Sequence, residues 1–187
     1  MNTKTTYIRF FAGVNDSSVR RLMQTVEAKL KDNVERFVLL ISSPGGSVFH
    51  GLAAYNFLKG IPAEVITHNF GSVDSMGVVM YCAGSTRYCV PHARFLLHGP
   101  SAQFAQPTAL EEKQLEERLK GLRIDIENIA GVIAANTGRS EEEVHRAMLE
   151  RTALDPEGAM QWGLTHEIKE ELFPTGADLI QIEEGPP

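Results

Sequence analysis

The chain has 187 residues and a formal net charge of −6; 43% of its residues are hydrophobic and 22% are charged. This length predicts a single domain over residues 1–187 with one hydrophobic core. The charge is spread along the chain, which argues against a nucleic-acid partner because phosphates are bound by clustered Lys and Arg. No apolar run approaches the roughly 20 residues of a membrane span, and the polar N-terminus lacks the apolar region of a secretory signal. We therefore expect a cytoplasmic protein without a membrane partner.

Two cysteines, Cys82 and Cys89, are too few for a disulfide framework or a structural zinc site. We expect both to be buried as small apolar side chains. The six histidines show no HxxxH spacing, so the sequence predicts no metal centre.

Strand-like and helix-like stretches alternate through the first part of the chain. The apolar run from Phe37 to Ile41 is typical of a strand that is buried on both faces. The first helix has its apolar residues on one face, with Asp16 or Ser17 as its expected N-cap. In chain order we expect a strand at 7–12, a helix at 16–31, a strand at 37–41, a helix at 48–59 and a strand at 64–67.

Two short strands and three helices are expected in the second part. The strands, 87–90 and 94–97, are joined around Pro91, and a long helix over about 108–136 ends before Gly138. Capping residues mark the starts of the three helices: Thr108 with Glu111, Ser140 with Glu143, and Asp155 with Pro156. Strands that alternate with helices predict an α/β fold with a mostly parallel sheet, whose active site lies at the carboxyl ends of the strands.

Two turns follow expected strands at that edge. The first, Ser43–Ser47, contains two adjacent glycines whose backbone N–H groups can point outward at the start of a helix, which suits a phosphate or an oxyanion. It lacks the GK[ST] ending of a P-loop and the GxGxxG spacing. The alternative interpretation is a tight turn without a binding role.

The second turn, Gly71–Gly77, places Ser75 at the start of a helix between small residues, much as a nucleophile elbow displays its serine. It does not match GxSxG, and a serine in this position is also a common N-cap. His98 ends the strand 94–97 beside Gly99, where it could reach a neighbouring turn. The alternative interpretation of His98 is a structural, partly buried histidine.

Taken together, three motifs in this order closely resemble the proteolytic subunit of the Clp proteases. They are Ser-Pro-Gly-Gly at Ser43–Gly46, Gly-x-x-x-Ser-Met-Gly at Gly71–Gly77, and Pro-x-x-Arg-x-x-x-His at Pro91–His98. The resemblance runs roughly from Phe37 to Glu167, with Trp162-Gly163-Leu164 in place of a usual Tyr-Gly-Leu.

The resemblance implies a ClpP/crotonase-like fold with a protruding handle helix at about 108–136. It implies Ser75 as the nucleophile and His98 as the general base, with the backbone N–H groups of Gly46 and Met76 as the oxyanion hole. The implied function is that of a serine endopeptidase that hydrolyses short or unfolded peptides through an acyl-serine intermediate. It needs no cofactor, and its implied assembly is a homo-oligomer, a heptameric ring or double ring.

The chain departs from the family at the third catalytic residue, which is usually an aspartate. Counting forward from Thr137-Gly138 and back from Trp162-Gly163-Leu164 leads to Arg151, which has only hydrogen-bond donors and cannot accept from an imidazole N–H. Glu150 or Asp155 could take this role, although Asp155 is also expected to cap a helix. A backbone carbonyl or a water could orient His98 instead.

A second departure concerns partners. The chain enters its first strand within a few residues of Met1, and the connector Gly99–Pro107 is rich in Ala, Gln and Pro where the family has a glycine-rich strand. Both differences argue against docking to a AAA+ unfoldase, while ring assembly is still expected. Two other functions stay open: a catalytically silent ring subunit, and a crotonase-type acyl-CoA enzyme that shares the oxyanion-hole geometry.

Overall fold

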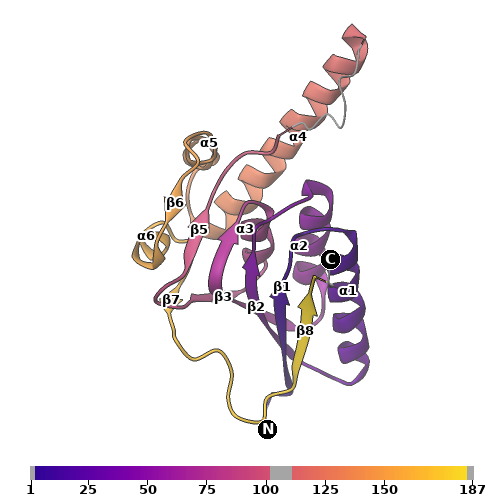
Figure 1. Ribbon diagram of the computed structural model, residues 1–187, viewed down its shortest axis with the longest axis vertical. Coiled ribbons are helices and arrows are strands. Elements are labelled where there is room, and N and C mark those ends of the chain that lie inside the picture. Colours follow the sequence, from indigo (N-terminus) through magenta and orange to yellow (C-terminus); the bar gives the residue numbers. More distant parts are fainter. Residues whose placement is uncertain (1–2, 102–110, 185–187) are drawn as a thin grey trace.

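The computed structural model describes residues 3–101 and 111–184. Within these residues the chain forms an eight-stranded, mostly parallel sheet with helices packed around it (Figure 1). The strands lie in the order β6-β5-β3-β2-β1-β8, and β4 pairs with β3 and β7. The α/β class and the mostly parallel sheet expected from the sequence are therefore confirmed.

The elements have the following bounds: β1 Thr5–Phe11, α1 Asp16–Lys31, β2 Arg36–Ser43, α2 Val48–Gly60, β3 Glu64–Asp74, α3 Met76–Tyr81, β4 Thr86–Cys89, β5 Arg94–Leu96, α4 Glu112–Thr137, α5 Glu141–Leu149, β6 Ala153–Leu154, α6 Pro156–Gln161, β7 Glu167–Ile168 and β8 Leu179–Glu183. Helix α4 projects beyond the sheet, as the handle helix was expected to do (Figure 1).

Three local predictions need correction or completion. Asn15, and not Asp16 or Ser17, caps α1, because its side chain accepts from the Ser18 N–H while the Ser18 hydroxyl accepts from the Asn15 N–H. The expected strand at 64–67 continues to residue 74. Glu111, expected as the last residue of a capping box that starts at Thr108, is instead the N-cap of α4, and its backbone N–H donates to the Gln114 side chain. Thr108 itself and most of the connector that follows Gly99 lie outside the described residues.

Strand β3 is long because it has partners along its whole length. It pairs with β2 on one side, and on the other side first with β4, at Ile66–Asn69, and then with β5, at Ser72–Asp74. Beside it, β2 forms the middle of the core, and its residues Phe37–Ile41 are at most 7% exposed. This arrangement brings the ends of β2, β3 and β5 to one edge of the sheet.

Arg87 on β4 is a buried cation, and the sequence pattern gave no sign of it. It is 4% exposed, and its guanidinium donates only to backbone carbonyls, those of Gly84, Asn136, Gly163 and Leu164. The Asn136 carbonyl belongs to the end of α4, those of Gly163 and Leu164 to the turn after α6, and that of Gly84 to the turn after α3. The negative ends of the helix dipoles favour a cation at these places. Arg87 thereby fixes both ends of the segment that carries α5, β6 and α6.

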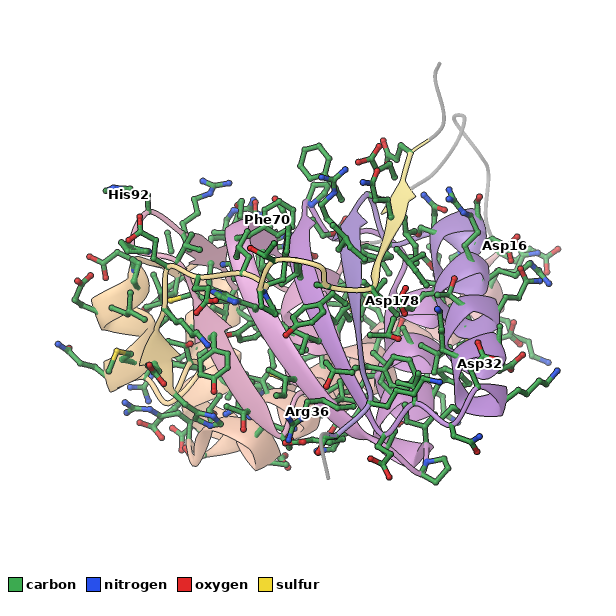
Figure 2. The ribbon with its side chains drawn as sticks, turned by 90° about the horizontal axis from the view of Figure 1, so that it is seen from below. Asp16, Asp32, Arg36, Phe70, His92 and Asp178 are labelled. Carbon is green, nitrogen blue, oxygen red and sulfur yellow. The ribbon has the colours of Figure 1, made fainter. Side chains whose placement is uncertain are left out.

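The last described segment crosses from β7 at one side of the sheet to β8 at the other (Figure 1). Asp178 lies just before the start of β8 (Figure 2). Its carboxylate accepts hydrogen bonds from the Thr6 hydroxyl and the Lys29 ammonium group. Strand β8, which the sequence patterns did not predict, pairs in parallel with β1. None of the helices in the described ranges has the length and apolarity that a bilayer crossing requires.

Candidate active site

The turns after β2 and β3 lie against each other. At Gly45 the backbone φ is +85°, and a Cβ there would lie 2.5 Å from the Ser75 Cβ and 2.7 Å from the Asp74 carbonyl oxygen. At Gly46 φ is +149°, and a Cβ would overlap the Val14 carbonyl. Only glycine fits both positions: Gly45 is required by the contact between the two turns, and Gly46 by the approach of the Val14 backbone.

Ser75 has a backbone conformation that is uncommon for a residue with a side chain, with φ 56° and ψ −124°. The turn is fixed by hydrogen bonds from the Ser75 N–H to the Leu96 carbonyl, 2.8 Å, and from the Val78 N–H to the Ser75 carbonyl, 2.9 Å. Ser75 occupies the N-cap position of α3, as the alternative interpretation expected, but its hydroxyl makes no capping hydrogen bond to the helix. A strained serine at a sharp strand-to-helix turn is the arrangement that displays a nucleophile.

Ser75 and His98 line the same cavity, which has a volume of about 540 Å³. Gly46 and Met76 line it as well, so all four residues expected at the site come together there. The rest of the wall is largely apolar, formed by Pro44, Val48, Val78, Leu97, Pro100, Ile129, Ile133 and Met148, with Ser47 and Ser101 as its other polar members.

The half-buried His98 ring is oriented by the neighbouring backbone. Its Nδ1 lies 2.8 Å from the Gly99 carbonyl oxygen. A carbonyl can only accept, so Nδ1 carries the proton and Nε2 is left with a lone pair. That is the tautomer that a general base toward a serine hydroxyl requires.

The other histidines do not compete for this role, because none of them lines the cavity. Burial lowers the pKa of His68 to about 4, and its Nε2 lies 2.8 Å from the Lys169 carbonyl oxygen. The His166 Nδ1 accepts from the Arg87 N–H. Cys82 is buried as expected, and desolvation raises the pKa of its thiol to about 12, which leaves no thiolate near neutral pH.

The two expected oxyanion donors are backbone N–H groups at the cavity wall. Met76 is the first residue of α3, where an N–H has no carbonyl partner within the helix. Two backbone hydrogen bonds join the turn around Gly46 to Val14. The Val14 N–H donates to the Gly45 carbonyl, 2.7 Å, and the Ser47 N–H donates to the Val14 carbonyl, 2.8 Å. These bonds do not use the Gly46 N–H, which suits it to a ligand oxygen.

The position where an aspartate was expected lies beside the strand of His98. Strand β6 pairs antiparallel with β5, and the Leu97 N–H donates to the Thr152 carbonyl, 2.9 Å. Arg151 is exposed and has φ 54°, a left-handed conformation that asparagine and aspartate tolerate better than arginine. Asp155 caps α6 by accepting from the Gly158 N–H, 2.8 Å.

Three polar residues beside the site were missed by the sequence analysis. Asp74, Ser72 and Arg94 form a closed hydrogen-bonded cluster next to the nucleophile turn. Ser72 and Asp74 alternate along β3, a spacing that places them on one face. The partner across the strand pair, Arg94, could not be assigned from the sequence, because the β3–β5 register was unknown.

The parallel sheet, the projecting helix and a serine–histidine cavity at the strand ends define a protein of the ClpP-like class. The sequence matches the Clp protease family over residues 3–171, and the chain belongs to that family. It is 32% identical over 162 residues to ATP-dependent Clp protease proteolytic subunit 1 of Streptomyces avermitilis, covering 85% of this chain and 73% of that protein.

A second relative and a solved structure agree with this assignment. The chain is 31% identical over 158 residues to ATP-dependent Clp protease proteolytic subunit 2 of Corynebacterium efficiens, covering 83% of this chain and 77% of that protein. A mutant of ClpP1 from Listeria monocytogenes superposes with a TM-score of 0.78 at 24% identity, over 90% of this chain and 92% of that one. The solved structure confirms the ClpP-like fold expected from the motifs.

The contact between the two turns makes a direct prediction. Gly45→Ala places a methyl group against Ser75 and should shift the hydroxyl by a sizeable fraction of an ångström. A misplacement of about 1 Å can cost roughly 10²-fold in rate, so we expect a loss of that order in the labelling rate of Ser75 by a fluorophosphonate. Gly60→Ala, where a Cβ meets nothing within 4 Å, is the control. Equal labelling of both variants would contradict the required contact.

Proposed function

We propose that this chain is a serine endopeptidase that hydrolyses short or unfolded peptides. The observation that carries the proposal is the strained Ser75 in one cavity with His98, whose Nδ1 is already held by the Gly99 carbonyl. A serine hydroxyl is a weak nucleophile until a base accepts its proton, and this histidine tautomer leaves Nε2 available for that step.

The chemistry follows from these groups. Ser75 Oγ attacks the peptide carbonyl while its proton passes to His98 Nε2, and the N–H groups of Gly46 and Met76 hold the resulting oxyanion. Collapse of the intermediate expels the amine, which takes the proton from His98 and leaves an acyl-serine ester. A water then attacks the ester with His98 again as base, and returning the proton to Ser75 releases the carboxylic acid.

The Gly99 carbonyl fixes the His98 tautomer but carries no full charge. A carboxylate in this place would also stabilise the imidazolium that forms during attack, and its loss costs up to about 10⁴-fold in kcat in a serine protease triad. The proposed enzyme is therefore slow per turnover.

Apolar side chains around the cavity support a peptide substrate. Val78, Leu97, Ile129, Ile133 and Met148 surround the space beside Ser75 and His98, so an apolar side chain next to the cleaved bond can be buried there. The crotonase-type acyl-CoA alternative uses the same oxyanion geometry but has no need of Ser75 and His98 in this arrangement. Fluorophosphonate labelling and a peptidase assay distinguish the proposed enzyme from a catalytically silent ring subunit.

The first test concerns the nucleophile. Ser75→Ala removes the covalent route, so kcat for a fluorogenic peptide should fall by more than about 10⁴-fold. In the wild-type protein, mass spectrometry should locate a fluorophosphonate adduct on Ser75. Ser47→Ala, changed at another serine of the same cavity, should still be labelled at Ser75. An unlabelled wild-type protein without peptidase activity would establish the silent subunit instead.

The second test concerns the missing carboxylate. Arg151→Asp should raise kcat/KM by at least about 10-fold, since an aspartate fits the left-handed backbone and restores the carboxylate that the resemblance implies at this position for stabilising the imidazolium. Arg151→Ala is the control, because it removes the arginine without adding a carboxylate. An equal rise in both variants would contradict the carboxylate explanation.

The same measurement decides between the alternative partners of His98. Asp155→Asn and Glu150→Gln should leave kcat/KM close to wild type, because Asp155 already caps α6 and the Gly99 carbonyl holds Nδ1. A large loss in either variant would identify that carboxylate as the third catalytic group.

The proposal includes a homo-oligomer, most simply a seven-fold ring or double ring as the resemblance implies. Helix α4, which is expected at the interface, buries Ile129 and Ile133 in the core. Leu115 and Leu119, four residues apart on its projecting part, are 50% and 48% exposed. Exposed apolar side chains in one region suit a contact with a neighbouring subunit. The names of the two relatives describe them as ATP-dependent. We propose peptide hydrolysis by this chain without an ATPase partner.

Assembly is tested by multi-angle light scattering at micromolar concentration, where we expect a homo-oligomer. Leu119→Lys should weaken the assembly, since it puts a charge into the proposed apolar contact. Lys120→Ala, one residue further along the helix, is the control. A monomeric wild-type protein would refute this part of the proposal.

A further inference from the structure

The geometry between Ser75 and His98 depends on a very short strand pair. β3 leads directly into Ser75, and β5 leads through Leu97 into His98. The two strands are in register over only three residue pairs: Ser72 with Arg94, Val73 with Phe95, and Asp74 with Leu96. Any slippage or opening of this pair moves the two reacting side chains relative to each other.

A polar cluster joins the two strands on one face of this pair. The Ser72 hydroxyl donates to Asp74 Oδ1, 2.8 Å, and Arg94 Nη2 donates to Asp74 Oδ2, 2.7 Å. Arg94 Nε closes the ring by donating to the Ser72 hydroxyl oxygen, 2.8 Å. Both carboxylate oxygens of Asp74 are thus used, and the planar guanidinium spans both β3 residues.

Asp74 is the buried member of the cluster. The Asp74 side chain is 12% exposed, so its charge is largely removed from water and depends on Arg94 and Ser72. Arg94 is 59% exposed and reaches Asp74 from the solvent side. On the opposite face, Val73 and Phe95 are fully buried, so the strand pair is held by apolar packing on one side and by this ring on the other.

The cluster does not touch the reacting atoms. It lines a second cavity of about 370 Å³, whereas Ser75 and His98 line the first, and Pro44 contributes to the walls of both. Asp74 is nevertheless the residue immediately before the strained serine. A strained backbone persists only where its surroundings over-determine it. The cluster therefore adds to the constraints already described at Ser75, which are its hydrogen bonds with Leu96 and Val78 and the contact with Gly45.

We propose that Asp74, with Arg94 and Ser72, is a positioning residue that holds the strained Ser75 backbone in place relative to His98. The inference rests on the proposed function for its catalytic consequence, but its structural part concerns the β3–β5 pair alone. Loss of the cluster then loosens the nucleophile turn without changing the substrate-binding wall of the cavity.

Strand β3 offers a matched control at its other end. Glu64, the first residue of β3, pairs across the sheet with Arg36 of β2, and the two form an ion pair of 2.6 Å between Glu64 Oε2 and Arg36 Nε. This is also a cross-strand carboxylate–guanidinium pair, but it lies at the amino end of the strand, far along the sequence from Ser75. Asp74→Ala is therefore compared with Glu64→Ala.

The first measurement is amide hydrogen exchange, which needs no catalytic activity. The Ser75 amide should exchange about 10-fold faster or more in Asp74→Ala, while the amides of Val65 to His68 on the same strand keep their wild-type rates. Glu64→Ala should leave the Ser75 amide unchanged. An unchanged Ser75 exchange rate in Asp74→Ala would overturn the inference, whatever the chain does with peptides.

The second measurement is peptide hydrolysis, where a positioning role has its own signature. Asp74→Ala and Arg94→Ala should each lower kcat by about 10-fold or more with KM nearly unchanged, and the double variant should be no worse than either single variant. Arg94→Lys keeps the positive charge but loses the planar guanidinium that contacts Asp74 and Ser72 at the same time. Its kcat should therefore lie between those of the wild type and Arg94→Ala. Effects that multiply in the double variant, or that appear only in KM, would contradict the inference.

Two further outcomes are distinguishable. If Asp74→Ala does not fold, the same exchange measurement is made on Arg94→Ala, whose side chain is exposed in the wild-type protein. Faster exchange of the Ser75 amide is expected in Arg94→Ala, and an unchanged rate would count against the inference. If the wild-type protein neither cleaves peptides nor reacts with a fluorophosphonate, the proposed function fails, while the exchange rates still decide whether the cluster holds the turn.

Discussion

The contact of the Gly45 backbone with Ser75 is the constraint on which the site depends. Two strands of a parallel sheet end side by side, and the turns that follow them approach so closely that no side chain fits between them. This approach brings Gly46 and Met76 to the wall of the cavity that Ser75 lines. The same contact keeps Ser75 in a backbone conformation that a free turn would leave.

The orientation of His98 by a neutral carbonyl sets the electrostatics of the proposed reaction. The Gly99 oxygen selects the His98 tautomer that the proposed proton transfer from Ser75 requires. It offers only a dipole to the imidazolium that forms, where a carboxylate would offer a full charge. A carboxylate would both orient the imidazole and stabilise its positive charge, whereas the Gly99 carbonyl orients the ring without supplying a full negative charge.

The β3–β5 pair connects the polar cluster to the cavity through backbone. One face carries the Asp74–Arg94–Ser72 ring, the other carries buried Val73 and Phe95, and the strand ends carry Ser75 and His98. Further along, Arg87 fixes the ends of α4 and α6 and so holds the segment that supplies β6, the next strand beside β5. Charged side chains outside the cavity thus support β3, β5 and the segment that carries β6.

The sequence alone determined the alternation of strands and helices, most element positions, and the residues that gather at the candidate site. These features are local: the apolar run of β2, the caps at Ser140 and Asp155, and the glycine and serine turns are readable within a few residues. Only the tertiary structure decided the partner of His98, the ring at Asp74, the buried carbonyl contacts of Arg87 and the pairing of β8. Each depends on which strands or backbone atoms lie beside one another, and a cross-strand register leaves no mark in the local pattern of either strand.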